Sequence, residues 1–387
     1  MAIPLKYNLR NLVVRRNTTL MTAFSITLTV AVFVVLMALA KGLQLSLSAT
    51  GQPSNILILR EGSQSEATSS VGRETLQVIT YLSGIAKNAK GGPWVSPELI
   101  VLINLPRRNQ TQGSNVTIRG LGPDGPSLRP EFKIMGGRFF RSGLREVIVS
   151  KRISERFQDC GLGDKLRFAK GYWTVVGTFE AGGTAYDSEI WTDVNELAAD
   201  FDRDAYSSVI VRATDASALA RLKDQISGDR RLHLKTQSER EYYDSQTRFA
   251  APIKALGFFI AVLMAVGASF AAMNTMYAAV ARRTKEIGTL RVLGFSRGSI
   301  LLSFVLESVF IALLGGAIGC VLALPVNGVT TGTTNFATFS EVAFNFRVTP
   351  PLLMNGMMFA LFMGLFGGLF PAWRAAHENI VTALRSA

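Results

Sequence analysis

Cysteine and histidine, which build most metal centres and many nucleophilic sites, are scarce in this sequence. The 387 residues include two cysteines, Cys160 and Cys320, and two histidines. No Cys/His cluster has the spacing of a zinc site, and two distant cysteines give no disulfide framework. The phosphate-binding pattern Gly-x-x-x-x-Gly-Lys-Ser/Thr is also missing, which excludes a nucleotide site of that type on this chain. We therefore expect the chain itself to bind no metal or cofactor.

One acidic pattern could suggest calcium. Asp200, Asp202 and Asp204 alternate, but they lack the glycine and the downstream bidentate glutamate of an EF-hand loop. A solvated turn is the better interpretation. Hydrolysis by paired carboxylates has no sequence signature, so an enzyme with an outward-facing active site stays open as a minor alternative.

Long apolar stretches are what the sequence has instead. They run from Thr22 to Ala40, Ile253 to Ala281, Ser299 to Val326 and Leu352 to Phe370. A helix needs about 20 mostly apolar residues to cross a bilayer. The long segment between the first two stretches has ordinary globular composition. The sequence thus predicts a membrane α-helical protein with four transmembrane helices and a large inserted α+β extracytoplasmic domain.

The predicted boundaries follow from these stretches and the residues that flank them. They are a cytoplasmic segment at 1–17, the first span at 18–41, the α+β domain at 42–252, the second span at 253–281, a cytoplasmic coupling helix at 282–297, the third span at 298–326, a short periplasmic loop at 327–350, the fourth span at 351–371 and a cytoplasmic tail at 372–387.

A net charge of +13 would be compatible with nucleic-acid binding, so the position of the basic residues along the chain matters. Residues 42–252 hold 27 Lys and Arg against 24 Asp and Glu, whereas the rest of the chain holds 14 against 4. The basic excess therefore flanks the spans. Short basic loops stay in the cytoplasm, and four spans place all these segments on one side. We expect both termini in the cytoplasm, the large domain outside, and no nucleic-acid partner.

The first span also resembles a signal peptide, because a basic leader and an apolar run precede Ala38-Leu39-Ala40. That run exceeds the about 7–15 residues of a usual signal core. Cleavage would also oppose the orientation that the basic loops favour. We interpret the segment as an uncleaved signal anchor.

Short β-type runs separated by Gly, Pro and Asp predict strands in the outer domain. They lie at Asn55–Leu59, Glu98–Leu105, Val116–Arg119, Glu146–Val149, Lys165–Phe168, Trp173–Phe179 and Ser207–Arg212. Helical patterns lie at Glu74–Lys87, Lys151–Phe157 and Ala216–Ser227. This mixture predicts an α+β domain with two subdomains.

The basic loop between the second and third spans has its own pattern. Ile287, Leu290 and Leu293 recur at helical spacing opposite charged positions, and Gly294 is a plausible helix stop. The loop is therefore predicted to form a short amphipathic helix at the membrane surface. It either anchors to lipid headgroups or docks a cytoplasmic partner.

Three groups of motifs resemble one family. The loop sequence Arg283-Thr-Lys-Glu-Ile-Gly-Thr-Leu-Arg-Val-Leu-Gly-Phe-Ser296 resembles that of the permease subunits of MacB/FtsX-type ABC transporters, the four-span mechanotransmission class. Gly367-Gly-Leu-Phe-Pro371-Ala-Trp-Arg374-Ala-Ala and Val381-Thr-Ala-Leu384-Arg385 resemble its closing motifs. Gly136–Phe140, Glu146–Ser150, Gly163–Leu166 and Trp173–Gly177 follow the order of its periplasmic domain.

Two departures from the family are visible. Glu378-Asn379-Ile380 replaces the usual Asp/Asn-Pro before the last motif. MacB-type proteins carry an ATPase domain fused ahead of the first span, whereas we expect none on this chain. We therefore expect a separate permease similar to DevC-like and lipoprotein-releasing permeases.

The resemblance implies a coupling mechanism. A cytoplasmic ABC ATPase dimer would carry ATP and Mg²⁺, and the helix after the second span would fit a groove in it. The implied contact consists of Arg282, Arg283, Glu286, Ile287, Leu290, Arg291, Leu293 and Gly294. Its apolar members would fill the groove, and Arg283, Glu286 and Arg291 would pair with charges at the rim. Pro371, Arg374, Leu384 and Arg385 would support the contact.

The resemblance also implies partners and a location. Because two ATPases share each nucleotide site, a second permease copy or a paralogue is expected. The implied function is efflux or extrusion of a lipoprotein, glycolipid, peptide or drug from a bacterial inner membrane through a periplasmic adaptor and outer-membrane duct. The alternative is an FtsX-like signalling protein that regulates a cell-wall hydrolase without transport. The large outer domain favours efflux.

Glu307 lies inside the third apolar stretch. A carboxylate within the membrane is costly and is therefore a candidate functional residue. The alternative is that it pairs with a basic residue of the loop, such as Arg291. A proton relay is not expected, because no second acid or histidine lies in the four stretches.

Overall fold

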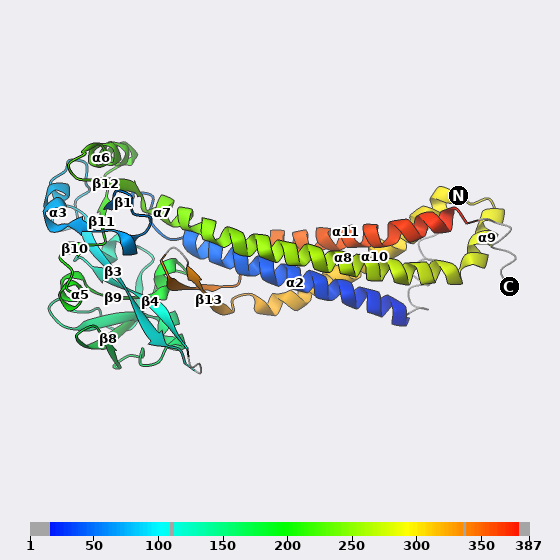
Figure 1. The fold of residues 1–387 in the computed structure, drawn as a ribbon, viewed down its shortest axis with the longest axis horizontal. Coiled ribbons are helices and arrows are strands. Elements are labelled where there is room, and N and C mark those ends of the chain that lie inside the picture. Colours follow the sequence, from blue (N-terminus) through cyan, green and yellow to red (C-terminus); the bar gives the residue numbers. More distant parts are fainter. Residues whose placement is uncertain (1–15, 109–111, 336–337, 379–387) are drawn as a thin grey trace. The chain divides into compact units, whose positions relative to one another are not determined.

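The computed structural model describes residues 16–108, 112–335 and 338–378, and it divides into two compact units (Figure 1). The first, which we call the helical unit, includes the described parts of Met1–Lys41, Pro252–Val329 and Phe346–Ala387. The second, which we call the outer domain, includes the described parts of Gly42–Ala251 and Thr330–Asn345.

Four long helices build the helical unit: α2 (Arg16–Ser48), α8 (Ala250–Arg282), α10 (Arg297–Ala323) and α11 (Pro350–Ala376). Each contains a stretch long and apolar enough to cross a membrane. Even 27 residues rise about 40 Å at 1.5 Å per residue, which exceeds the roughly 30 Å of a hydrocarbon core. The predicted fold class, four candidate membrane helices with an inserted α+β domain, is confirmed.

Local sequence determines where two of these helices begin. Ser296 precedes α10, and its hydroxyl accepts a hydrogen bond from the backbone N–H of Ser299 at 3.2 Å. It thereby satisfies one of the N–H groups that a first turn leaves without a partner. Pro350 and Pro351 occupy the first turn of α11, where proline costs nothing because those N–H groups have no intrahelical acceptor.

Glycines let these helices approach closely. A Cβ placed on Gly315 would lie 2.7 Å from the carbonyl oxygen of Ala23 in α2. A Cβ on Gly364 in α11 would lie 2.6 Å from the Cβ of Ala312 in α10. The close approach also lets the Thr27 hydroxyl donate to the carbonyl of Gly315 at 3.0 Å. Lipid tails are apolar, so the hydrophobic effect does not drive helices together within a membrane. Close packing of small residues and interhelical hydrogen bonds of this kind hold them together instead.

A ten-stranded mixed sheet organises the outer domain, in the order β12-β1-β11-β3-β4-β9-β6-β8-β5, with β7 paired to β8. Within the described residues, β4–β9 and β6–β8 are parallel pairs and the other pairs of this sheet are antiparallel. The strands are β1 (Asn55–Arg60), β3 (Val95–Pro106), β4 (Gly113–Leu121), β5 (Lys133–Gly137), β6 (Glu146–Ser150), β7 (Lys165–Phe168), β8 (Gly171–Glu180), β9 (Glu189–Asp193), β11 (Ser208–Arg212) and β12 (Leu234–Ser238).

Short helices cover this sheet, and a second small pair of strands joins β2 (Val71–Gly72) to β10 (Ala205–Tyr206). The helices are α3 (Arg73–Thr80), α4 (Lys151–Arg156), α5 (Val194–Asp200), α6 (Ala216–Gly228) and α7 (Glu239–Gln246). Two apolar cores form on the sheet. One centres on Ile56, Val209 and Leu222, and the other on Val116 and Trp173. The two predicted subdomains thus share one continuous sheet.

Two sequence-based predictions are wrong in part. The helix predicted at Glu74–Lys87 ends at Thr80, because Gly84 takes a left-handed conformation (φ +98°) and Ile85 forms a β-bridge to Ala213. The short loop predicted at 327–350 contains a hairpin of β13 (Thr330–Asn335) and β14 (Ser340–Asn345).

That hairpin is a part of the outer domain. The Ser188 hydroxyl accepts a hydrogen bond from the backbone N–H of Ala343 at 2.7 Å. The same hydroxyl donates a hydrogen bond to the carbonyl oxygen of Ala343. Glu341 is buried and forms ion pairs with Arg107 and Arg156. The sequence predicted only a short loop here, because nothing local shows that Glu341 and Ala343 meet residues from far earlier in the chain.

The glycine packing of the helical unit predicts an asymmetric result for two similar substitutions. Gly315→Ala should lower the thermal unfolding midpoint of the full chain in detergent, because its Cβ meets a backbone oxygen that cannot rotate away; overpacking of this kind costs about 1–3 kcal/mol. Gly267→Ala in α8 meets no atom within 4 Å and should leave the midpoint unchanged or raise it. Equal effects would show that the close approach at Gly315 does not exist.

Candidate coupling site

The predicted coupling helix is a short helix, α9 (Thr284–Val292), that follows α8 directly. Arg283 lies between the two helices and separates them, because its backbone is not helical (φ −109°, ψ 13°). At the other end, the N–H of Gly294 donates to the carbonyl of Arg291 and the N–H of Phe295 to that of Leu290. These two bonds form a Schellman motif, and the φ of +92° at Gly294 is the left-handed residue that this motif needs.

The two faces of α9 differ in exposure. Ile287 and Gly288 are buried, and Ile287 joins an apolar cluster with Phe304 of α10 and Ala372 of α11. The exposed side consists of Lys285, Glu286, Thr289, Val292 and the following Leu293. Val292 and Leu293, the two aliphatic residues on this side, are 62% and 66% exposed. We call these five residues the α9 outer face.

The structure therefore divides the predicted contact residues. Glu286 and Leu293 lie on the α9 outer face, and Arg282 and Gly294 are exposed beside it. Leu290 and Arg291 are half-buried, and Arg291 donates to the carbonyl of Phe295 at 3.4 Å.

Two predicted contact residues point inward instead. Ile287 was expected to fill a partner's groove. Instead it packs inside the chain, because its side chain faces α10 and α11 and contacts their apolar residues. Arg283 was expected at a charged rim. It is 5% exposed and is paired within the helical unit.

The partner of Arg283 is Glu307. The Arg283 Nη1 and Glu307 Oε2 atoms are 3.0 Å apart, and the two side chains are only 6% and 5% exposed. The guanidinium also lies 5.9 Å from the ring centre of Phe304. The sequence left open whether Glu307 is functional or paired, with Arg291 as an example of a partner. The structure shows the paired alternative, with Arg283 as the partner. The pair ties the α8–α9 junction to α10.

The C-terminal residues expected to support this site are placed in part. Pro371 is buried within α11, next to the alanines that pack under α9. Arg374 is exposed, and its guanidinium lies 5.9 Å from the ring centre of Tyr277. Leu384 and Arg385 lie outside the described residues.

Residues 294–298 match the Gly-x-Ser-x-Gly letters of a hydrolase nucleophile elbow. Such an elbow needs a strand before the serine. Here Ser296 follows α9 and caps α10 with its hydroxyl. The match therefore carries no catalytic meaning.

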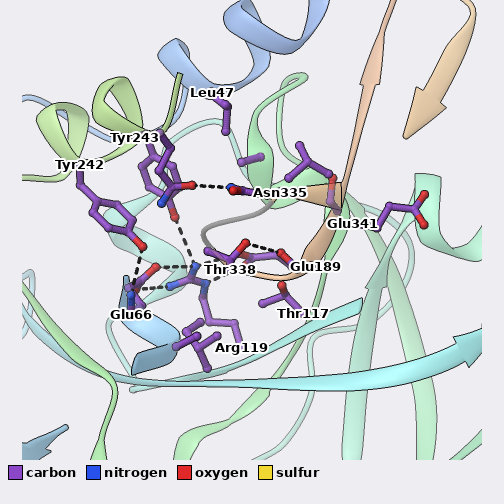
Figure 2. Close-up of a pocket in the computed structure, with 17 residues that line it drawn as sticks. Leu47, Glu66, Thr117, Arg119, Glu189, Tyr242, Tyr243, Asn335, Thr338 and Glu341 are labelled. Carbon is purple, nitrogen blue, oxygen red and sulfur yellow. Dashed lines mark hydrogen bonds and ion pairs between the residues drawn. The ribbon is translucent and has the colours of Figure 1, made fainter. Parts of the chain in front are cut away.

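A second polar centre, in the outer domain, was not predicted (Figure 2). Arg119 of β4 is 2% exposed and lies among three carboxylates. Its guanidinium nitrogens are 2.8 Å from Glu66, 2.6 Å from Glu98 and 2.8 Å from Glu189, and it also donates to the Tyr243 hydroxyl at 3.3 Å. This arrangement, the Arg119 network, joins four separate elements around one cation.

Arg129 extends the network. It forms two hydrogen bonds of 2.8 Å to the carboxylate of Glu98, one to each oxygen. Burial alone would raise the pKa of Glu98, but the charges of Arg129 and Arg119 outweigh it and hold the pKa below its ordinary value. For Arg119, burial is likewise outweighed, by Glu189 first, so its pKa stays well above the ordinary value. Glu98 and Arg119 are therefore charged at neutral pH.

A small polar cavity of about 40 Å³ opens beside the network (Figure 2). Its walls include Arg119, Tyr243, Asn335 and Glu341, and Asn335 donates to Gln246 at 2.9 Å. A space of this size and polarity suits a few water molecules. Within the described ranges, no group of three or more His, Cys, Asp or Glu could hold a metal ion.

Other polar candidates in the outer domain are structural. Cys160 is buried, and desolvation raises the pKa of its thiol to about 12, so it is not a reactive thiolate. Asp200, predicted as part of a solvated turn, is buried, accepts a hydrogen bond from the Trp173 indole at 3.1 Å and pairs with Arg145.

The comparisons with known proteins agree with this architecture. Residues 19–228 match the MacB-like periplasmic core domain, and residues 258–380 match the FtsX-like permease C-terminal domain. The first match covers more than half of the chain. Four candidate spans with an inserted α+β domain thus define a multi-pass membrane permease. The chain belongs to the MacB/FtsX-like ABC transporter permease family.

Individual relatives are similar at low identity. An uncharacterized ABC transporter permease, YknZ of Bacillus subtilis (strain 168), is 25% identical over 296 residues, covering 72% of each chain. The macrolide export ATP-binding/permease protein MacB of Chlorobium luteolum is 25% identical over 398 residues, covering 95% of this chain and 57% of its own length. The chain spans 36% of the MacB of Brucella abortus, at 29% identity over 59% of this chain.

The periplasmic region of MacB from Actinobacillus actinomycetemcomitans is a solved structure that was also matched. It has 13% sequence identity and a TM-score of 0.38, and the match covers 50% of this chain and 92% of that one.

The Arg119 network predicts a pH-dependent stability. Glu98→Gln should lower the thermal midpoint of the full chain at pH 7, because breaking a buried pair costs about 3–5 kcal/mol. Since the folded-state pKa of Glu98 lies below its ordinary 4.5, its contribution is complete above that pH and is lost as pH falls through the folded value. The gap between the two proteins should therefore shrink in acid.

The control for this experiment is Glu74→Gln, at an exposed position of α3. It should change the midpoint little at any pH. A gap for Glu98→Gln that stays constant from pH 7 to the acid limit would contradict the charged assignment.

The Arg283–Glu307 pair predicts a thermodynamic cycle. Glu307→Gln and Arg283→Gln should each lower the thermal midpoint, since each leaves one buried group without its partner, and the double variant should lose less than the sum. Arg282→Gln, one residue earlier but exposed, is the matched control. Additive losses would show that the two side chains do not interact.

Proposed function

We propose that this chain is the permease subunit of an ABC transporter and that the α9 outer face docks a separate cytoplasmic ATPase. The observation that supports this is the division of α9 into a buried side and an exposed aliphatic end. Val292 and Leu293 are exposed on a helix that is otherwise fixed by its own packing. A rigid helix with an apolar tip is suited to the groove of a partner.

The fixed side of α9 supports force transmission. Ile287 packs on α10 and α11, and Arg283 is paired with Glu307 of α10. A push on the α9 outer face would therefore reach two spans at once rather than bend a loop. ATP and Mg²⁺ would bind to the partner ATPase, and closure of two ATPases on ATP would supply the push.

The proposed orientation places α9 and both termini in the cytoplasm. Arg282, Arg283, Lys285, Arg291 and Arg297 all lie between α8 and α10 or at their ends. A short loop so rich in arginine and lysine stays on the cytoplasmic side. The outer domain then faces the periplasm, and the proposed location is a bacterial inner membrane.

The proposed work is extrusion of a periplasmic or membrane-derived cargo, such as a lipoprotein, glycolipid, peptide or drug. In the described parts of α8, α10 and α11, the acid within the apolar stretches is Glu307, which is already paired. The helical unit therefore offers little to a hydrophilic cargo, and movement of the outer domain is the better candidate for the working stroke. A second permease copy or a paralogue, a periplasmic adaptor and an outer-membrane duct are the further proposed partners.

Co-purification tests the docking proposal. The tagged full chain is expressed with candidate ABC ATPases of its host, and the amount of ATPase recovered is compared between variants. Leu293→Asp should reduce ATPase affinity by about thirtyfold, as expected when a charge replaces a central apolar contact. Glu286→Lys should weaken it as well.

Val78→Asp provides the matched control, because Val78 is a half-exposed aliphatic residue of α3 in the outer domain. It should leave ATPase recovery unchanged. Thermal midpoints of all variants establish that they are folded. Equal recovery with Leu293→Asp and with the unmodified chain would remove the basis of the coupling proposal.

A further inference from the structure

α8 and α11 enclose an apolar groove of about 660 Å³ on the surface of the helical unit. Large side chains at helical spacing form its two walls. They include Val266, Phe270 and Tyr277 from α8 and Phe362, Phe366 and Phe370 from α11. Both helices lie side by side in Figure 1. Phe270 and Phe366 are 63% and 60% exposed.

One end of the groove carries a positive charge. Arg374 follows Phe370 by four residues, which places both on one face of α11. The Arg374 guanidinium lies 5.9 Å from the ring centre of Tyr277, the last lining residue of α8. Arg374 is exposed, and it forms no ion pair with a carboxylate of residues 16–108, 112–335 and 338–378. The groove is therefore apolar along its walls and cationic at its mouth.

We infer that this groove binds one acyl chain of an anionic phospholipid, with the lipid phosphate at Arg374. The lining of α8 from Val262 to Tyr277 rises about 22 Å, which exceeds the roughly 15 Å of one leaflet. The groove is therefore long enough to hold an acyl chain over the full thickness of one leaflet. The guanidinium and the Tyr277 hydroxyl supply donors that match a phosphate.

A flexible chain fits this groove better than a rigid helix does. Helices that pack in a membrane bring small residues together so that their backbones approach. The lining of this groove includes small residues such as Ala265 and Ser269, but large side chains such as Phe270 and Phe366 stand beside them and keep a partner's backbone at a distance. A partner helix would also cover Arg374 and would have to neutralise it, whereas a lipid phosphate does so directly. The inference does not depend on ATPase coupling.

Photolabelling of the full chain in nanodiscs tests this directly. The bilayer is phosphatidylcholine with a trace of phosphatidylglycerol that carries a diazirine on one acyl chain, and labelled peptides are mapped by mass spectrometry. Labels should concentrate on 262–277 and 359–370 relative to the exposed face of α10 at Ile318, Val321 and Leu322. Unlabelled phosphatidylglycerol should compete about fivefold better than phosphatidylcholine, as one basic residue near the headgroups allows. Even labelling of the three helices would overturn the inference.

Two variants separate the headgroup from the chain. Arg374→Gln should abolish the preference for phosphatidylglycerol while groove labelling persists, and Arg282→Gln, exposed at the same end, should keep the preference. Ala265→Trp, or Ser269→Leu if the first does not accumulate, should reduce groove labelling, since both residues line the groove. A preference that survives Arg374→Gln would overturn the phosphate assignment. A disulfide between two Phe366→Cys copies, with the groove unlabelled, would show that a second copy occupies it instead.

Discussion

Arg119 lies in the centre of the outer domain with three carboxylates around it, and strands β3, β4 and β9 are joined through that guanidinium. A buried cation without partners would cost far more than any single apolar contact provides. The positions of Glu66, Glu98 and Glu189 are therefore fixed by one requirement. The network joins β3, β4 and β9, the middle strands of the sheet that carries both apolar cores. Removing one of its charges would leave the others uncompensated at the centre of that sheet.

In the helical unit, too, a buried arginine is paired with a carboxylate, in this case Arg283 with Glu307. Arg283 lies where α8 ends and α9 begins, and pairing with Glu307 turns its side chain inward. In the same arrangement Ile287 faces the spans and Val292 and Leu293 face outward. The Schellman motif at Gly294 then ends α9, and Ser296 caps the start of α10. The exposed face of α9 and the pairing of a buried charge at its start thus belong to one arrangement.

Periodicity and length were sufficient to predict the four spans and most strands, because both signals are local. They could not predict which face of α9 is buried, since Ile287, Leu290 and Leu293 share a spacing but differ in their neighbours. The Arg119 network was missed for a related reason. Glu98 and Arg119 are charged residues at buried positions of β3 and β4, and such a charge in a buried strand was the available signal. Which acid meets which base depends on long-range pairing that no local pattern contains.

The hairpin β13–β14 makes the outer domain discontinuous in sequence. Its main part is complete by residue 251, yet Glu341, the partner of Arg107 and Arg156, comes some 90 residues later, after α8 and α10. During synthesis from the N-terminus, the domain would wait for two membrane helices before its last strands arrive. Contacts of such high sequence separation slow folding. Maturation of the outer domain is consequently linked to insertion of the helical unit, and a fragment that stops at residue 251 is an incomplete domain rather than a shorter one.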